Sequence, residues 1–160
     1  MADKEDIGSI PIPPTDPFPG RGPMIARVGH EVLVGDVRSC ISYRGLAVHV
    51  WQSRQDRCAY RETAEDSLVI EYAEGTQLSE QIIQNVWAFA AIPGPLLIHC
   101  YAGQGRGPTL AIVAKAARGC DVFHALEDVA RAMWRDYSYQ CAPQFLGLPM
   151  TDIIGWLMRR

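Results

Sequence analysis

Apolar residues in the first two thirds of the chain gather into four short segments that predict β-strands. These segments are residues 31–37, 46–52, 68–73 and 95–100. Gly, Arg or acidic residues bound the first three of them, as strand ends usually require. Between the third and fourth segments, residues 77–92 carry apolar side chains at helical spacing until Pro93 and Gly94 end the run. A strand, a helix and a strand in this order predict a parallel crossover.

The chain after residue 105 is predicted to be helical. Pro108 suits the first turn of a helix that begins near Arg106, and Gly119 is a suitable residue to end it. A second helix is predicted from Val122 to about Arg135. Its core-facing stripe is predicted to contain Phe123, Leu126, Val129 and Met133.

The C-terminal residues 143–160 predict one or two shorter helices, broken near Gly147 and Pro149. Early strands followed by late helices indicate an α/β fold. We expect a central, mostly parallel sheet of about four to five strands, flanked by helices in a three-layer architecture. Six of the eleven prolines fall within the first 23 residues. We therefore predict an irregular N-terminal arm at 1–28 and a single domain at 29–160.

Composition narrows the classes of function. The net charge of −3 and the scattered basic residues predict no nucleic-acid partner. Apolar runs are too short for a membrane span, so we expect no membrane partner. The five cysteines are an odd number without a Cys-x-x-Cys pair, which favours free thiols in a reducing, cytoplasmic setting and no metal site.

The strongest chemical pattern is the glycine-rich segment at 99–106, which joins a buried strand to a helix. Gly103 and Gly105 allow successive amide groups to converge on one point, and the following helix adds its positive N-terminal end. Such a site favours an anion. The predicted phosphate-binding residues are Tyr101, Ala102, Gly103, Gln104, Gly105 and Arg106.

Cys100 and Arg106 are the predicted reactive pair of this loop. A sulfur at the strand end would face the amides and be favoured as a thiolate, the nucleophilic form of cysteine. The planar guanidinium of Arg106 would bind two phosphate oxygens. A cysteine at a strand end is often a small core residue, and a glycine-rich turn can be a simple connection. The joint pattern favours the chemical interpretation over both.

At these residues the chain resembles the protein tyrosine phosphatase superfamily, most closely its dual-specificity branch. The signature of that family is His-Cys, five residues and Arg, followed by Ser or Thr, and His99, Cys100, Gly103 and Arg106 match it. The resemblance extends over residues 31–148. It implies that Cys100 forms a phosphocysteine intermediate, that Arg106 binds phosphate throughout, and that His99 supports the thiolate. It implies no cofactor and no metal.

Two departures from the family pattern affect the catalytic residues. Gly107 stands where the family has a hydroxyl that helps the sulfur to depart, so turnover is expected to be slow unless Thr109 compensates. The family's general acid is an aspartate upstream of the cysteine. Glu74 occupies the expected place, with Asp66 as the competing choice. A carboxylate at Glu74 is equally well explained by the positive end of the helix that follows it.

The sequence therefore predicts a cysteine-dependent phosphatase that acts on a phosphoprotein or a small phosphomonoester. Tyr101 and Gln104 stand where lipid-directed and inositol-directed branches place basic residues, which argues against highly charged inositol phosphates. The main alternative is a phosphate- or phosphopeptide-binding module without turnover. A sulfur-transfer enzyme is a third, weaker alternative, because a thiolate beside anion-binding amides can also carry a persulfide.

Overall fold

The computed structural model describes residues 25–39, 43–51, 64–72, 76–100, 106–137 and 148–160. The strands in these ranges are β1 (Ile25–Gly29), β2 (Val32–Gly35), β3 (Leu46–Trp51), β4 (Asp66–Glu71) and β5 (Leu96–His99). The helices are α2 (Glu80–Ala90), α3 (Arg106–Ala117), α4 (Val122–Tyr137) and α5 (Leu148–Met158). All four predicted strands and the four predicted helical regions are present in the described residues, with ends that differ by a few residues.

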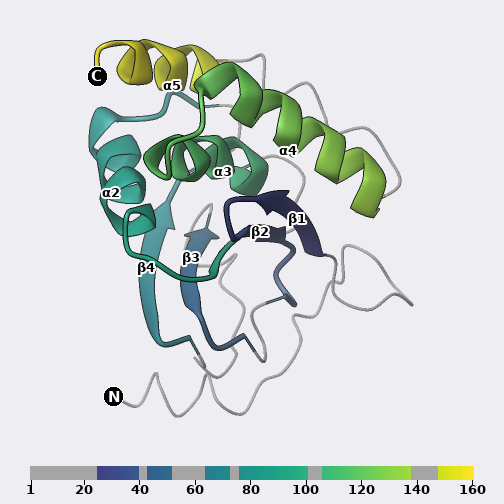
Figure 1. Cartoon of the computed structure of the whole chain (residues 1–160). Helices are drawn as coiled ribbons and strands as arrows, with labels where there is room; N and C mark the ends of the chain where they lie inside the picture. Colours follow the sequence, from purple (N-terminus) through teal and green to yellow (C-terminus); the bar gives the residue numbers. More distant parts are fainter. Residues whose placement is uncertain (1–24, 40–42, 52–63, 73–75, 101–105, 138–147) are drawn as a thin grey trace, which may run out of the picture.

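The strands form one five-stranded sheet in the order β1-β2-β5-β3-β4. β1 is antiparallel to β2, whereas β2, β5, β3 and β4 run parallel. Figure 1 shows α2, α3, α4 and α5 stacked together on one side of the sheet. The predicted α/β class, the mostly parallel sheet and its flanking helices are confirmed, as is the crossover from β4 through α2 to β5.

Local sequence explains where two of the helices begin and end. Ser79 caps α2, because its hydroxyl accepts the amide of Ile82 at 3.2 Å. Gly119 follows α3 with a φ of +97°, a conformation that glycine adopts at little cost. The amide of Cys120 then donates to the carbonyl of Lys115 at 3.0 Å, so α3 ends as Gly119 predicted.

The middle strands of the sheet are buried on both faces. In β3, Val48 and Val50 face the helices and belong to the main apolar core. The alternate residues of the same strand, Ala47, His49 and Trp51, point to the opposite face and are also at most 3% exposed. A strand that is buried on both sides reads as a continuous apolar run, which is the pattern of residues 46–51.

The sheet begins earlier in the chain than predicted. All of β1 except Gly29 lies in the segment 1–28 assigned to the N-terminal arm, and the strand alternates exposed and buried residues. Its turn into β2 consists of His30 and Glu31, which have φ values of 57° and 60°. Two-residue hairpin turns of this kind favour Asn-Gly, so a His-Glu turn carries no sequence signal for the hairpin.

The core-facing stripe of α4 also differs from the prediction. Phe123 is 57% exposed, whereas its neighbour Val122 is buried together with Val129 and Met133. Positions 122, 125, 129, 132 and 133 follow the helical period more closely than a stripe that begins at 123. The large side chain of Phe123 favoured the wrong starting point. Within the described ranges, none of the helices combines the length and the apolar character needed to cross a membrane.

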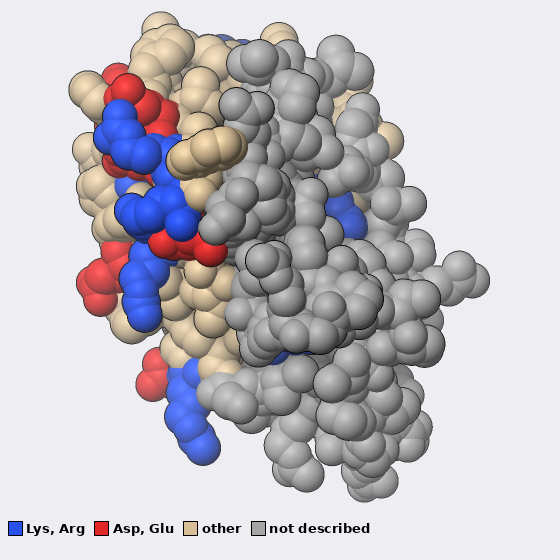
Figure 2. Space-filling model, turned by 90° about the vertical axis from the view of Figure 1, so that its right-hand side faces the viewer, with Lys and Arg blue, Asp and Glu red and all other residues tan. Residues whose placement is uncertain are grey.

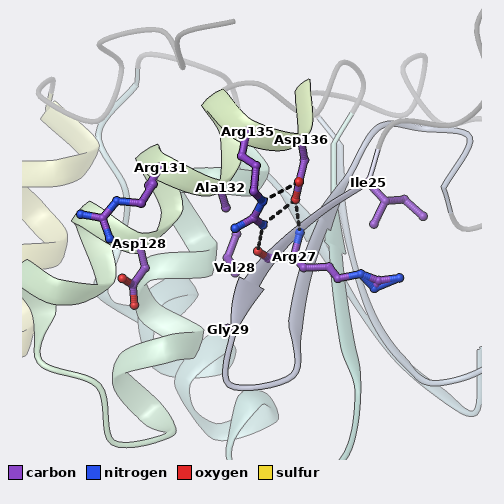
Figure 3. Close-up of a pocket in the computed structure, with 9 residues that line it drawn as sticks. All are labelled: Ile25, Arg27, Val28, Gly29, Asp128, Arg131, Ala132, Arg135 and Asp136. Atoms are coloured by element: carbon purple, nitrogen blue, oxygen red, sulfur yellow. Dashed lines mark hydrogen bonds and ion pairs between the residues drawn. The ribbon is translucent and has the colours of Figure 1, made fainter. Parts of the chain in front are cut away.

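Side chains at the end of α4 bind the outer edge of β1, as Figure 3 shows. The amide of Arg27 donates to Asp136 Oδ2 at 2.9 Å, and Arg135 Nη2 donates to the carbonyl of Arg27 at 2.8 Å. Arg135 also binds both carboxylate oxygens of Asp136 at 2.7 Å. The hydrogen bond from Arg135 holds the pKa of Asp136 below its usual value, and the Arg27 amide acts in the same direction. These side chains satisfy main-chain groups that a neighbouring strand would otherwise bind.

The Asp136 contacts predict a pH-dependent contribution to stability. The folded-state pKa of Asp136 is lowered, so its contribution is complete above the unfolded-state pKa of about 3.9 and is lost as pH falls through the folded pKa. Asp136→Asn should therefore unfold at a lower urea concentration than wild type at pH 7. The difference between the two urea midpoints should become smaller towards pH 3. Glu127→Gln, in an exposed pair with Arg131, is the control. A difference in urea midpoint between wild type and Asp136→Asn that does not change with pH would contradict a stabilising role of the ionised Asp136 carboxylate.

Candidate active site

Cys100 lies at the edge of the sheet where its parallel strands end. β5 ends at His99, and Cys100 follows it with only 2% of its surface exposed. The amide of Cys100 donates to the carbonyl of Gly35, the last residue of β2, at 3.4 Å. The carboxyl ends of parallel strands form the usual binding edge of an α/β sheet. The predicted nucleophile is therefore on the expected side of the fold.

The sulfur of Cys100 lies against the N-terminus of α3. The amide of Gly107, the second residue of that helix, donates to Sγ at 3.3 Å. Amides in the first turn of a helix have no partner within the helix, and the helix dipole places positive charge there. Both effects favour a negatively charged sulfur, as a nucleophilic cysteine requires.

Two further predicted residues belong to the same turn of α3. Arg106 is the first residue of the helix and is 7% exposed, and Thr109 is 2% exposed. A buried guanidinium at this position brings a positive charge to the helix end that contacts Cys100. The predicted phosphate-binding residues Tyr101, Ala102, Gly103, Gln104 and Gly105 lie outside the described residues.

Gly107 leaves space beside the sulfur. A Cβ atom at this position would lie 3.4 Å from Cys100 Sγ and 3.5 Å from the carbonyl oxygen of Ile98, both at the close end of ordinary van der Waals contact. The backbone of Gly107 is also outside the left-handed region. A serine at this position would therefore fit without strain. The missing hydroxyl of the family pattern is a difference in chemistry rather than a steric requirement for glycine.

The structure does not bring Asp66 to Cys100. Asp66 begins β4 and pairs in register with Leu46 of β3, which in turn pairs with Leu96 at the start of β5. Cys100 follows Leu96 by four positions, which is roughly 13 Å along the strand direction. Asp66 is exposed at the opposite end of the sheet, where it accepts the amide of Ser67 at 2.9 Å. The other candidate acid, Glu74, lies outside the described residues.

Sequence reasoning missed a buried ion pair next to the cysteine. Asp36 follows β2, is fully buried, and accepts both the amide and Nη2 of Arg38 at 3.0 Å. The main-chain carbonyl of Asp36 also accepts the hydroxyl of Ser39 at 2.7 Å. These bonds shape the turn that leaves β2 next to the end of β5. The available signal was an acidic residue directly after a buried strand, with arginine two positions later.

Sequence reasoning also missed His49, the polar residue within the apolar strand β3. His49 is 2% exposed and pairs in register with His99 of β5, which is fully buried. His49 Nδ1 lies 2.6 Å from His99 Nε2. The predicted supporting histidine therefore contacts a second histidine from a neighbouring strand.

Cys100 and Cys120 are free thiols, as the odd number of cysteines predicted. They differ in their surroundings. Burial raises the pKa of the Cys120 thiol, and Lys115 only partly opposes this effect. A raised pKa lowers the fraction of Cys120 that is thiolate at neutral pH, and the thiolate is the reactive form.

A hollow of about 910 Å³ lies between β1 and α4, and its lining contains none of the predicted site residues (Figure 3). Basic and acidic residues alternate in its lining, where Asp128 and Arg131 precede the bound pair of Arg135 and Asp136 along α4. Figure 2 shows the same alternation of blue and red atoms over the described part of this side of the molecule. This mixture of charges gives no preference for an anion, in contrast to the helix end at Cys100.

Comparison with solved structures identifies the fold. Human DUSP28 aligns with a TM-score of 0.62 and 15% identity, over 91% of this chain and 98% of its own. A mouse putative dual specificity phosphatase complexed with zinc tungstate aligns at 0.61 and 17%, over 89% and 94%. PTPMT1 in complex with PI(5)P aligns at 0.55 and 16%, over 85% and 98%. The chain therefore has the fold of these dual-specificity phosphatase structures. No protein-family model and no curated protein matches the chain.

The Asp36 and Arg38 pair predicts a large loss of stability when it is broken. Asp36→Ala leaves a buried guanidinium without its carboxylate, which typically costs about 3–5 kcal/mol. Glu80→Ala removes an exposed carboxylate that binds Arg159 at 2.9 Å, and a loss within about 1 kcal/mol is expected. Urea unfolding of both variants measures the difference. If the two variants lost equal free energies of unfolding, the buried pair of Asp36 and Arg38 would be worth no more than the exposed pair of Glu80 and Arg159.

Proposed function

We propose that this chain, which has the dual-specificity phosphatase fold, is a cysteine-dependent phosphatase that hydrolyses phosphomonoesters. The observation that carries the proposal is the hydrogen bond from the Gly107 amide to the sulfur of Cys100. It joins the nucleophile of the signature to the start of the helix that the signature arginine begins. Fold likeness alone does not establish an activity, so the proposal rests on this contact and on the spacing from His99 to Arg106.

The proposed reaction has two steps. The Cys100 thiolate attacks phosphorus, so that an S–P bond forms and the bond from phosphorus to the leaving oxygen breaks. An acid supplies a proton to that oxygen. Water then attacks the phosphocysteine and gives a proton to the same acid group, the S–P bond breaks, and inorganic phosphate and the thiolate are released. Arg106 would bind two phosphate oxygens in both steps, while the loop at 101–105 would supply amides.

Glu74 is the proposed general acid. Asp66 lies at the far end of the sheet, which leaves Glu74 as the remaining candidate from the sequence. In the sequence Glu74 follows β4, which runs parallel to β5 and ends with it towards the edge that carries Cys100. Thr109, buried in the first turn of α3, is a further supporting residue of the proposed site.

The proposed substrate is a phosphorylated protein or a small phosphomonoester. Tyr101 and Gln104 give the loop no basic side chain besides Arg106. A tetrahedral oxyanion suits the site that we propose, and tungstate, with which the mouse phosphatase was complexed, is one suitable probe. The free thiols of Cys100 and Cys120 favour action in a reducing compartment, and we propose the cytoplasm.

Hydrolysis of an aryl phosphate tests the proposal directly. The purified protein should release phosphate, and Cys100→Ser should abolish the release because an alcohol at this site is far less ionised than a thiol. Arg106→Ala should lower kcat/KM by about 10²–10³, the usual cost of losing one fixed donor to transition-state charge. Cys120→Ser is the matched control and should retain activity. Equal inertness of wild type, Cys100→Ser and Arg106→Ala would refute the phosphatase proposal.

The alternative is a phosphate- or phosphopeptide-binding module without turnover, and Gly107 favours it. No hydroxyl follows Arg106, so in the second step the departing sulfur has the Gly107 amide but not the hydroxyl donor of the family pattern. A binding module would retain tungstate or a phosphopeptide and lose it on Arg106→Ala, while no phosphate is released. Isothermal titration next to the hydrolysis assay separates the two functions.

Gly107→Ser tests whether the missing hydroxyl limits turnover. The serine Cβ fits at 3.4 Å from Cys100 Sγ, and its hydroxyl would be close enough to donate to the sulfur. We expect wild type to show a burst of phenol followed by a slow steady state, and Gly107→Ser to raise the steady-state rate about tenfold or more. Gly107→Ala is the matched control, because it adds the same Cβ without the hydroxyl. Equal steady-state rates for the serine and alanine variants would contradict this explanation.

A further inference from the structure

The register of β3 and β5 places two histidines side by side behind the active-site strand. His49 and His99 are paired residues of these parallel strands, and both are at most 2% exposed. Their side chains point to the face of the sheet opposite the helices, because the residues on either side of them belong to the helix-facing core. Cys100 is next to His99 in the chain and belongs to that core, so the sulfur and the imidazole leave the strand on opposite faces.

The two rings share one hydrogen bond. His49 Nδ1 lies 2.6 Å from His99 Nε2, so one of these nitrogens carries the hydrogen and the other accepts it. Trp51 holds the pair in place. Its ring stacks on His49 at 5.8 Å between centroids and 5° between planes, and it meets His99 edge-on at 5.2 Å.

The shared hydrogen links the tautomers of the two neutral rings. If His49 Nδ1 donates, His99 Nε2 accepts, and the hydrogen of neutral His99 is on Nδ1. If His49 Nδ1 accepts, His99 Nε2 donates, and His99 Nδ1 becomes an acceptor. His99 Nδ1 is itself buried in the protein. Whether His99 Nδ1 donates or accepts a hydrogen bond therefore depends on whether His49 Nδ1 carries the shared hydrogen.

Filling space in the sheet interior does not by itself explain these residues. The preceding residues on the same face are apolar: Ala47 in β3 and Leu97 in β5, both fully buried. Two imidazoles in such a layer lose their water and need hydrogen-bond partners inside the protein to offset that cost. Apolar residues of similar size would fill the space without this penalty. A polar pair at the last paired position before Cys100 indicates a role that depends on its hydrogen bond.

We propose that His49 is a positioning residue of the active site, which selects the tautomer of His99 and thereby orients the strand end that carries Cys100. The inference rests on the phosphatase function proposed above, since it concerns the same cysteine. His49 acts through His99 and the main chain. The main-chain bond next to it, from the Cys100 amide to Gly35, is long at 3.4 Å, so the histidine pair is a substantial constraint on this end of β5.

The test measures the reactivity of Cys100 without requiring turnover. Wild type, His49→Phe and His49→Asn are treated with iodoacetamide from pH 5 to pH 9, and alkylation is followed by mass spectrometry of the peptide that contains Cys100. Cys120, whose pKa is raised by burial, is the internal reference. His124→Phe is the matched control, since this histidine is 75% exposed on α4.

His49→Phe should slow alkylation of Cys100 roughly three- to tenfold at pH 6.5, the range that one hydrogen bond contributes, and move the profile to higher pH. His49→Asn should retain most of the wild-type rate, because the asparagine amide can occupy the position of Nδ1 and both donate and accept. His124→Phe should match wild type. A folded His49→Phe with the wild-type profile would overturn the proposal, and so would equal losses in the Asn and Phe variants.

Nitrogen NMR of histidine-labelled wild type provides a test that needs no variant. One protonated and one unprotonated nitrogen should be found at the His49 Nδ1 and His99 Nε2 pair, and two protonated nitrogens would refute the proposal. The phosphatase assay fails independently. If wild type releases no phosphate but His49→Phe shifts Cys100 alkylation, the positioning role stands and the proposed function does not. If wild type is active but His49→Phe alkylates Cys100 with the wild-type pH profile, the proposed function stands and the positioning role does not.

Discussion

The position of the first turn of α3 against the end of β5 is the constraint on which the candidate site depends. The Gly107 amide reaches the sulfur of Cys100 at 3.3 Å only because α3 begins where β5 leaves the sheet. Every residue from Arg106 to Lys115 is buried, since α3 packs on the sheet between α2 and α4. A helix that is enclosed on all sides cannot shift along its axis without disturbing the core. The geometry at Cys100 is therefore a consequence of packing across the whole domain.

Lys115 fixes the other end of α3. Its side chain is fully buried, and its ammonium group donates to the carbonyl of Val28 and binds His30 Nδ1 and Asp128 Oδ2, both at 3.1 Å. A buried charge is tolerated when such partners surround it. A Cβ at position 29 would lie 2.8 Å from this ammonium group, and φ there is +93°. Both the lack of space and the backbone conformation therefore favour glycine at this position. These contacts join α3 to the β1–β2 hairpin and to α4.

The parts of this molecule that could be predicted from sequence are those that depend on neighbours along the chain. Apolar segments located β2, β3, β4 and β5, Gly119 located the end of α3, and the spacing from His99 to Arg106 located the candidate site. β1 was missed because its turn lacks the usual residues, and its edge is bound by side chains more than 100 positions away.

The rest of the site depends on which strands lie side by side, and no local pattern carries that information. β5 inserts between β2 and β3, so Asp36 and His49 become neighbours of the strand that carries Cys100 only in the folded sheet. The parallel direction of β4 and β5 also separates Asp66 from Cys100, because Asp66 begins its strand whereas Cys100 follows the end of its own. Fold class and nucleophile can be predicted from motifs, whereas the supporting residues require the topology.

The histidine pair adds a constraint on strand register that apolar residues could not supply. A slip of one residue between β3 and β5 would move His49 to the other face of the sheet and leave both imidazoles buried without each other. The same slip between two apolar strands would exchange one valine contact for another at lower cost. A buried polar pair therefore penalises the wrong register more than it stabilises the right one, which is its best-attested structural effect in proteins. Since Cys100 follows His99 directly, a penalty on this register also limits where the sulfur can lie relative to α3.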